Sequence, residues 1–258
     1  MCLILFAYKV HPAYPLIVAA NRDEFYERPS SPAAFWGGTR QILAGRDLKE
    51  GGTWLGITRE GKFAAITNYR DPAALKSGAP SRGKLVKNYL QGSSSAAAYV
   101  RKISRQADIY NGFNIMCADG TDLFVYSSRG EQQKLAAGIY GLSNRFLDSP
   151  WPKVVWGKKA MSAAMSEKGA DLETALFALL ADRKIAPDNK LPSTGIGLEW
   201  ERLLSAVFIE SPVYGTRSST VLLIGKNGWV KFVEKVFDGK PEPWVESRFS
   251  FRLAGGKQ

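Results

Sequence analysis

The fold is decided by the first two apolar runs of the chain and by the polar segment that follows the second. These stretches are Leu3-Ile4-Leu5-Phe6-Ala7-Tyr8 and Pro15-Leu16-Ile17-Val18-Ala19-Ala20, followed by Asn21-Arg22-Asp23-Glu24. Residues 9–14 contain Pro12 and are typical of a turn. The runs therefore predict two buried, paired strands. The polar segment is expected directly after the second strand, where side chains can project from the end of a sheet.

Further along the chain, groups of strand patterns alternate with paired helix patterns. Strands are predicted over residues 53–58, 62–67, 111–118, 122–126, 138–142, 220–224, 229–237 and 244–251. Helices are predicted as a pair within residues 82–105, from Pro152 to Met165, and from Asp171 to Ala181, where Asp171 can cap free backbone donors. This order argues against a parallel Rossmann arrangement. It predicts an α+β fold of antiparallel sheets covered by helices, in one domain over residues 1–258.

Composition indicates the class of protein and the cellular compartment to expect. The chain has 258 residues, of which 45% are hydrophobic, the profile of a globular protein with a sizeable core. No basic residue precedes the short apolar run at the start, so neither a signal peptide nor a membrane span is expected. We expect a cytoplasmic protein whose two cysteines, Cys2 and Cys117, stay reduced thiols.

The net charge of +11 favours anionic partners: nucleic acid, an acidic lipid surface, or a small molecule with carboxylates or phosphates. The basic residues are scattered, which does not favour nucleic acid, and a solvated basic surface is the simpler explanation. The expected partner is a small anionic amphipathic ligand or an acyl amide, without stable membrane insertion. The oligomeric state stays open.

Cys2 is the strongest candidate for a catalytic residue, because removal of Met1 would make it the amino-terminal residue. Its thiol and its own α-amine both titrate close to neutral pH, so the amine could take the thiol proton and return it to a leaving group. Such a nucleophile needs no histidine, and the chain has only His11. The alternative is a small hydrophobe at the start of a buried strand. Cys117 is expected to be a buried structural thiol that reacts more slowly with alkylators than Cys2.

Other polar residues fall beside predicted strands. Asn68 and Asn144 each follow a strand, and an Asn amide can donate to a developing oxyanion. Arg217 precedes one. Each Asn could equally be a turn residue, and Asn21–Glu24 could be a surface ion-pair cluster.

Seven ordered motifs together resemble the NRDE family, also called the transport and Golgi organisation family. They are the Met-Cys start and residues 20–29, 51–56, 67–69, 110–114, 141–144 and 214–217. The resemblance implies an N-terminal nucleophile hydrolase architecture, an αββα sandwich of two antiparallel sheets between helical layers. It also implies catalytic roles at Cys2, Arg22, Asp23, Asn68, Asn144 and Arg217. In the related acylases the Arg and Asp stand two residues apart, so here either Asp23 or Glu24 could be the acid.

Two functions follow from these observations. The first is a thiol amidohydrolase in which Cys2 attacks a small acyl amide, Asn144 and a backbone amide stabilise the oxyanion, and no cofactor or metal is required. The second, implied by the resemblance, is non-catalytic binding and trafficking of haem, acyl-CoA or lipid. There Arg22 and Arg217 would hold anionic groups, Cys2 or His11 could contact iron, and ligand contacts would include Asn21, Glu24, Trp36 and Trp54. A structural or interaction role is the third alternative.

Overall fold

The computed structural model describes residues 2–38, 41–166, 171–237, 239 and 245–254. Met1, and Trp244 at the start of the last predicted strand, lie outside these residues. Contacts divide the chain into two compact units, Met1–Glu27 with Ala136–Ser250, and Arg28–Leu135 with Phe251–Gln258. We call them the first and the second unit. That residues 1–258 form a single domain stays a prediction.

The first unit contains a six-stranded antiparallel sheet with the strand order β10-β1-β2-β11-β12-β13. Its strands are β1 (Cys2–Tyr8), β2 (Leu16–Phe25), β10 (Gly138–Leu142), β11 (Tyr214–Ile224), β12 (Trp229–Val236) and β13 (Val245–Arg252), of which Phe251 and Arg252 are counted with the second unit. β1 is buried along its whole length, and it pairs with β10 on one side and β2 on the other.

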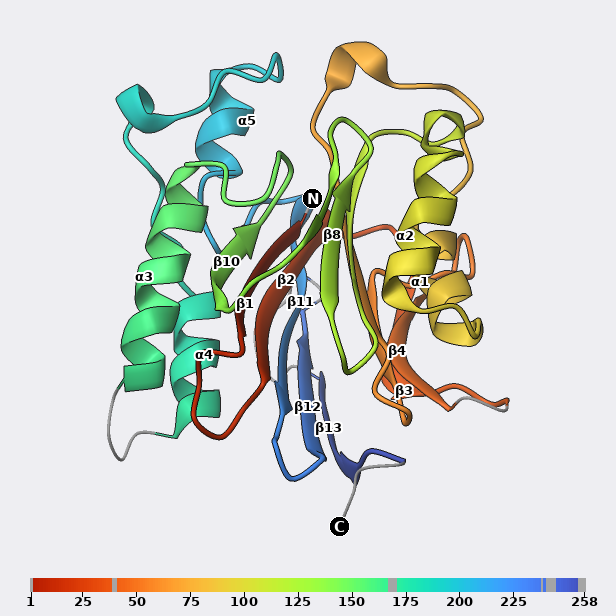
Figure 1. Cartoon of the computed structure of the whole chain (residues 1–258). Coiled ribbons are helices and arrows are strands. Elements are labelled where there is room, and N and C mark those ends of the chain that lie inside the picture. The colour runs from red at the N-terminus through yellow and green to blue at the C-terminus, as the bar shows by residue number, and fades with distance from the viewer. Residues whose placement is uncertain (1, 39–40, 167–170, 238, 240–244, 255–258) are drawn as a thin grey trace. The chain divides into compact units, whose positions relative to one another are not determined.

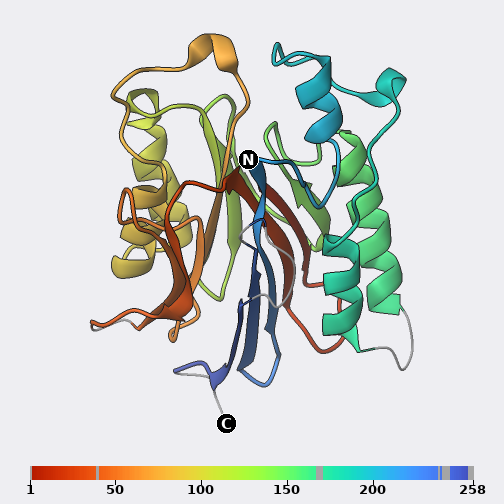
Figure 2. The same ribbon diagram turned by 180° about the vertical axis from the view of Figure 1, so that it is seen from behind.

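Helices α3 (Pro152–Ser166) and α4 (Leu172–Leu180) pack on one face of this sheet (Figures 1 and 2). The same unit holds α5 (Leu198–Leu203) and the short helix η3 (Asp188–Lys190). Asp171 caps α4 by accepting from the Thr174 N–H at 3.2 Å, as its position predicted. The helix-facing core comes from alternate strand residues such as Leu3, Leu5 and Val221.

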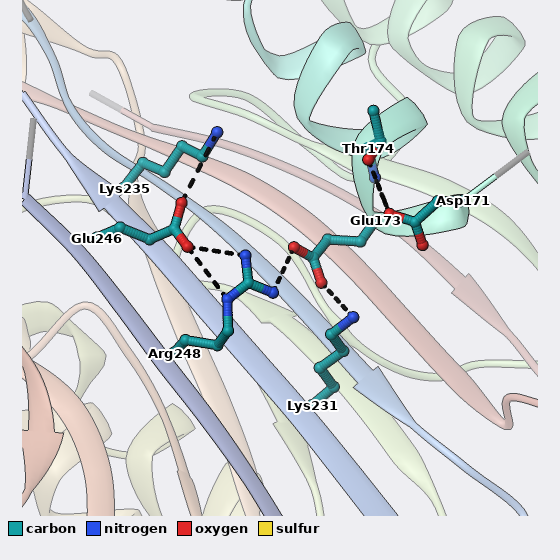
Figure 3. A network of polar contacts seen from close by, with 7 residues as sticks. All are labelled: Asp171, Glu173, Thr174, Lys231, Lys235, Glu246 and Arg248. Carbon is teal, nitrogen blue, oxygen red and sulfur yellow. Dashed lines mark hydrogen bonds and ion pairs between the residues drawn. The ribbon is translucent and has the colours of Figure 1, made fainter. Parts of the chain in front are cut away.

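Ion pairs also join α4 to the sheet (Figure 3). Glu173 of α4 lies 2.5 Å from Lys231 of β12 and 2.8 Å from Arg248 of β13. Arg248 in turn contacts Glu246, which lies 3.9 Å from Lys235. The Glu173 side chain is only 8% exposed, so its pairs are less screened than the surface pairs of this unit.

The second unit contains a seven-stranded antiparallel sheet with the strand order β3-β4-β5-β6-β7-β8-β9. Its elements are β3 (Ser30–Phe35), β4 (Ile42–Asp47), β5 (Leu55–Thr58), β6 (Phe63–Asn68), η1 (Pro72–Ala74), α1 (Gly83–Gln91), α2 (Ala96–Ser104), η2 (Ala107–Ile109), β7 (Phe113–Ala118), β8 (Leu123–Ser127) and β9 (Gln132–Lys134). α1 and α2 cover one face of the sheet (Figures 1 and 2), where Tyr89, Val100 and Phe113 pack in the core.

The predicted α+β class with two antiparallel sheets and paired helices is confirmed. β3, β4, β9 and α5 were not predicted, because their residues lack a clear apolar period. The main correction concerns β2, which continues through Phe25 because β1 pairs with it on one side and β11 on the other. Asn21–Glu24 therefore lies within a strand and not after its end.

Candidate functional site

The strand register brings Cys2 of β1 opposite Arg22 of β2, and Arg22 opposite Ser218 of β11. Residues that are directly paired in an antiparallel sheet present their side chains on the same face. Cys2, Arg22 and Ser218 therefore form a row on the face away from α3 and α4. Leu3, Asn21 and Ser219 form the next row, on the helix-covered face.

The Cys2 thiol is buried, with 8% of the residue exposed. Burial raises its pKa, and the negative charge of Asp23 raises it further, whereas a hydrogen bond from the Asp23 backbone N–H and the charge of Arg22 lower the pKa. The charge of Arg22 thus favours the thiolate, but burial has the larger effect and the pKa of Cys2 is raised overall. The resting thiol is therefore protonated and needs a base.

Arg22 supplies an unsatisfied donor beside this thiol. Its Nη1 atom is buried and makes no hydrogen bond among the residues that the structure describes. Leaving a buried donor of a charged group without an acceptor is costly, commonly more than about 1–3 kcal/mol. An anionic or carbonyl group of a ligand would satisfy it.

Asp23 lies on the opposite face of β2 from Arg22, because consecutive strand residues alternate. The residue is 1% exposed, and its Oδ1 accepts from the Thr216 hydroxyl at 2.9 Å. Burial raises the pKa of its carboxyl, and the charge of Lys153 on α3 lowers it. Glu24 is half-buried, and its carboxylate accepts from the Phe25 N–H at 3.0 Å. Of the two acids, only Asp23 affects the Cys2 pKa, through its charge and its backbone N–H.

Asn144 joins the site from the segment after β10. It is fully buried, and its Oδ1 lies 3.2 Å from the Ser143 hydroxyl. That hydroxyl also lies 3.1 Å from the backbone carbonyl oxygen of Cys2, to which it can donate. Ser143 thus links Asn144 to the residue that carries the thiol.

Asn21 and Arg217 make contacts that hold the fold. The Asn21 amide donates to the carbonyls of Leu180 and Val207 at 2.9 Å each, and its Oδ1 accepts from Ser219 at 2.6 Å. Arg217 stands at the bulge of β11 and donates to the carbonyls of Phe25 (2.9 Å), Tyr26 (3.1 Å) and Phe237 (3.2 Å). A ligand role for either residue stays a prediction.

Three predicted residues belong to the second unit. Asn68 ends β6, where it pairs with Phe113. Trp36 is 8% exposed and donates from its indole N–H to the Ala44 carbonyl at 2.9 Å, and Trp54 packs against the same hydrophobic core. Both tryptophans have the contacts of core residues. Their ligand roles, and the catalytic role of Asn68, stay predictions.

The prediction that Cys2 or His11 contacts a haem iron stays a prediction, but the two residues cannot contact one iron together. These two residues flank β1 at opposite ends, and its 7 residues span about 20 Å. The His11 Nδ1 accepts from the backbone N–H groups of Ala13 and Tyr14 at 3.2 Å each, which uses one ring nitrogen in the turn. Within the described ranges, no cluster of three or more His, Cys, Asp or Glu could hold a metal ion.

Sequence reasoning did not identify Ser143, Thr216 and Lys153 as neighbours of the predicted residues. Ser143 was detectable, since it stands in the Gly141–Asn144 motif beside Asn144. The sequence does not indicate that Lys153 is buried. Its 1% exposure arises from the packing of α3 on the sheet. Nothing in a sequence pattern shows a lysine buried near a carboxylate more than a hundred positions away.

Together, these features define an α+β protein with a buried thiol at a strand terminus, an unsatisfied arginine donor beside it, and a fully buried asparagine nearby. The family profile described as Transport and Golgi organisation 2 matches residues 1–239. The chain is 41% identical to the Transport and Golgi organization protein 2 homolog of Bos taurus and 40% identical to that of Homo sapiens. Each alignment covers 98% of this chain and 99% of the relative. The chain belongs to the Transport and Golgi organisation 2 family, which confirms the family prediction.

Among solved structures, the chain is similar to an N-acylethanolamine-hydrolyzing acid amidase ortholog of Caenorhabditis elegans. The TM-score is 0.47 at 12% identity, covering 86% of this chain and 92% of the other. We assign no residue role from this distant likeness. In the part of the chain that the structure describes, no helix is both long and apolar enough to cross a membrane.

Proposed function

We propose that this protein is a thiol amidohydrolase in which Cys2 attacks the carbonyl carbon of a small acyl amide. The observation that carries the proposal is the pairing of Cys2 with Arg22 across β1 and β2, with a buried Arg22 donor that makes no hydrogen bond among the described residues. A buried reactive group beside an unsatisfied cationic donor lowers the stability of the fold. Such arrangements are concentrated at functional sites.

The thiol proton must leave before attack, because burial raises the pKa of Cys2. Removal of Met1 would place a free α-amine on the same residue, and this amine is the base of the proposed mechanism. The Asp23 N–H and the Arg22 charge lower the thiol pKa and so assist the transfer. The mechanism therefore requires the mature chain to begin at Cys2.

Attack forms a bond from the Cys2 sulfur to the acyl carbon and places a negative charge on the former carbonyl oxygen. Asn144, fully buried and linked to Cys2 through Ser143, is the proposed side-chain donor to this oxyanion, together with a backbone N–H. The C–N bond then breaks, and the leaving amine takes the proton held by the α-ammonium. Water hydrolyses the thioester to a carboxylic acid and restores the thiol.

Arg22 has the proposed role of holding an electronegative group of the substrate. Its buried Nη1 can donate to a carboxylate or to the developing oxyanion, and a charge-assisted hydrogen bond is roughly twice as strong as a neutral one. Arg217 has less freedom for this role, because it donates to three backbone carbonyls.

The test uses full-length protein from a host that removes the initiator methionine, verified by intact mass. Wild type, Cys2→Ala and the matched thiol control Cys117→Ala are incubated with a panel of acyl amides. We expect turnover and a covalent acyl adduct in wild type and Cys117→Ala, and neither in Cys2→Ala. Turnover that survives in Cys2→Ala would reject Cys2 as the nucleophile.

The unsatisfied Arg22 donor also favours a second candidate function, the carriage of an anionic ligand such as acyl-CoA or haem. In that case Arg22→Gln weakens ligand binding by about 2 kcal/mol through loss of a charge-assisted hydrogen bond, and Cys2→Ala changes affinity little. Binding measured by calorimetry alongside the turnover assay distinguishes the two. Wild type without turnover but with Arg22-dependent binding would support carriage over hydrolysis.

A further inference from the structure

Two hollows with a shared wall lie in the second unit, within the sequence range 76–129. One, of about 300 Å³, is lined by residues of α2 and the two residues that follow it. The other, of about 370 Å³, is lined by residues between Lys76, which follows η1, and Arg129 in the turn after β8. Arg105 lines both. η1 and the turn after β8 lie at the same end of this unit (Figures 1 and 2).

The charged residues that line the two hollows are mainly cationic. The basic side chains are Lys76, Arg101, Lys102, Arg105 and Arg129. The acidic residue that lines them is Asp108, while Asp71 lies 3.4 Å from Arg129. Among the described residues, the side chains of Arg101, Lys102 and Arg105 make no ion pair and no hydrogen bond, and all three residues are exposed. Their charge is thus available to an anionic partner.

Two large aliphatic side chains stand beside this cationic lining. Leu75 is 68% exposed and precedes Lys76, and Ile109 is 52% exposed and follows Asp108. Their segments are joined, because the Lys76 ammonium donates to the Asp108 carbonyl, and the Lys76 N–H donates to Asn111 at 2.7 Å. The Asn111 amide donates back to the Lys76 carbonyl at 3.1 Å. These contacts hold the Leu75 and Ile109 segments together at the rim.

We propose that this surface docks the protein on an anionic phospholipid bilayer. The hollows would hold lipid phosphates through Arg101, Lys102 and Arg105, while Leu75 and Ile109 enter the boundary between headgroups and acyl chains. Charge complementarity and exposed aliphatic side chains beside a basic surface are the two features that peripheral membrane binding needs. The proposal uses no residue of the Cys2 site.

The test is co-sedimentation of the full-length protein with vesicles of phosphatidylcholine alone or with about a third phosphatidylserine, at an ionic strength near 0.1 M. We expect binding to the anionic vesicles only. Arg105→Gln should weaken it about fivefold, the effect of one basic side chain near such a surface. Leu75→Ser should weaken it about tenfold through lost apolar burial.

The matched control is Leu48→Ser with Lys49→Gln, a pair of exposed residues in the same unit that do not line the hollows. It should bind like wild type. Equal sedimentation with neutral and anionic vesicles, or equal weakening in the control, would overturn the proposal. Binding abolished by millimolar glycerol 3-phosphate but unchanged by Leu75→Ser would also overturn it and assign the hollows to a soluble phosphate ester.

Discussion

The two cysteines of this chain lie on strands of similar burial but in chemically different surroundings. Cys117 on β7 pairs with Ala64 and Phe124, is 0% exposed, and belongs to the apolar core under α1 and α2. Cys2 on β1 pairs with Arg22, receives the Asp23 backbone N–H, and is 8% exposed. Burial raises the pKa of both thiols.

The difference shows that burial alone does not decide whether a thiol is structural. What separates the two is the nature of their neighbours. The charge of Lys62 lowers the pKa of Cys117, whereas both Arg22 and a hydrogen bond from the Asp23 N–H lower the pKa of Cys2. The polar surroundings of Cys2 have to be held in place by the rest of its unit. Four measurements test this difference between the two thiols.

The largest expected effect concerns the polar framework behind Cys2. Asn21→Ala removes three hydrogen bonds and leaves the Leu180 and Val207 carbonyls without this donor, so it should lower the free energy of unfolding by about 3–5 kcal/mol. Urea unfolding measures the loss. Ser219→Ala, which removes only one of the three bonds, should cost about 1 kcal/mol. Equal costs for the two variants would show that Asn21 does not hold this framework.

The next effect compares the two thiol positions with the same substitution. Cys117→Ser places a hydroxyl in an apolar core and should lower the free energy of unfolding by about 2 kcal/mol. Cys2→Ser should cost less, because the Asp23 N–H can donate to the new oxygen. The comparison is made from urea midpoints at constant m-value. A larger loss at position 2 would contradict the contrast drawn between the two sites.

A third measurement compares reactivity in the folded state. Iodoacetamide should label Cys2 at least about tenfold faster than Cys117, because only Cys2 combines some exposure with groups that favour the thiolate. Mass spectrometry after timed quenching gives both rates in one sample, and labelling in urea supplies the unfolded reference. Faster labelling of Cys117 would show that Cys2 is not activated.

The smallest expected effect is a shift in titration. Arg22 lowers the pKa of the Cys2 thiol, so Arg22→Gln should raise it and move the rise of the alkylation rate to higher pH. The labelling rate of Cys2 as a function of pH measures the shift. Arg217→Gln is the control, because its guanidinium is held by backbone carbonyls and should leave the profile unchanged. A shift to lower pH in Arg22→Gln would contradict the assigned sign.

The sequence predicted much of the secondary structure because apolar periodicity is a local property. The helices at Pro152 and Asp171 and the strands at Leu3 and Phe63 lie where the pattern indicated. The error at β2 has a physical cause, since its last residues are polar and stay extended only because β11 pairs with them. Polar strand ends of this kind depend on a partner that is distant in sequence.

The roles of the candidate site residues stay predictions, but their contacts can be compared with what the sequence indicated. Cys2, Arg22 and Asp23 were identified from residue type, and the structure places them around one thiol, whereas Trp36 and Trp54 carry the contacts of core residues. Residue type shows which chemistry a side chain can take part in. Packing decides which of its hydrogen-bond donors and acceptors are not used in structural contacts.

The α+β class, the family and the thiol at position 2 could be predicted from the sequence, because they depend on local pattern and on residue identity. Only the tertiary structure decided that Arg22 and Asp23 present opposite faces of β2. It also showed that Asn21 and Arg217 bind backbone carbonyls and that an Arg22 donor is left unsatisfied beside Cys2. The physical reason is that strand register and hydrogen-bond partners are set by pairing between segments as much as two hundred residues apart, which no local pattern encodes.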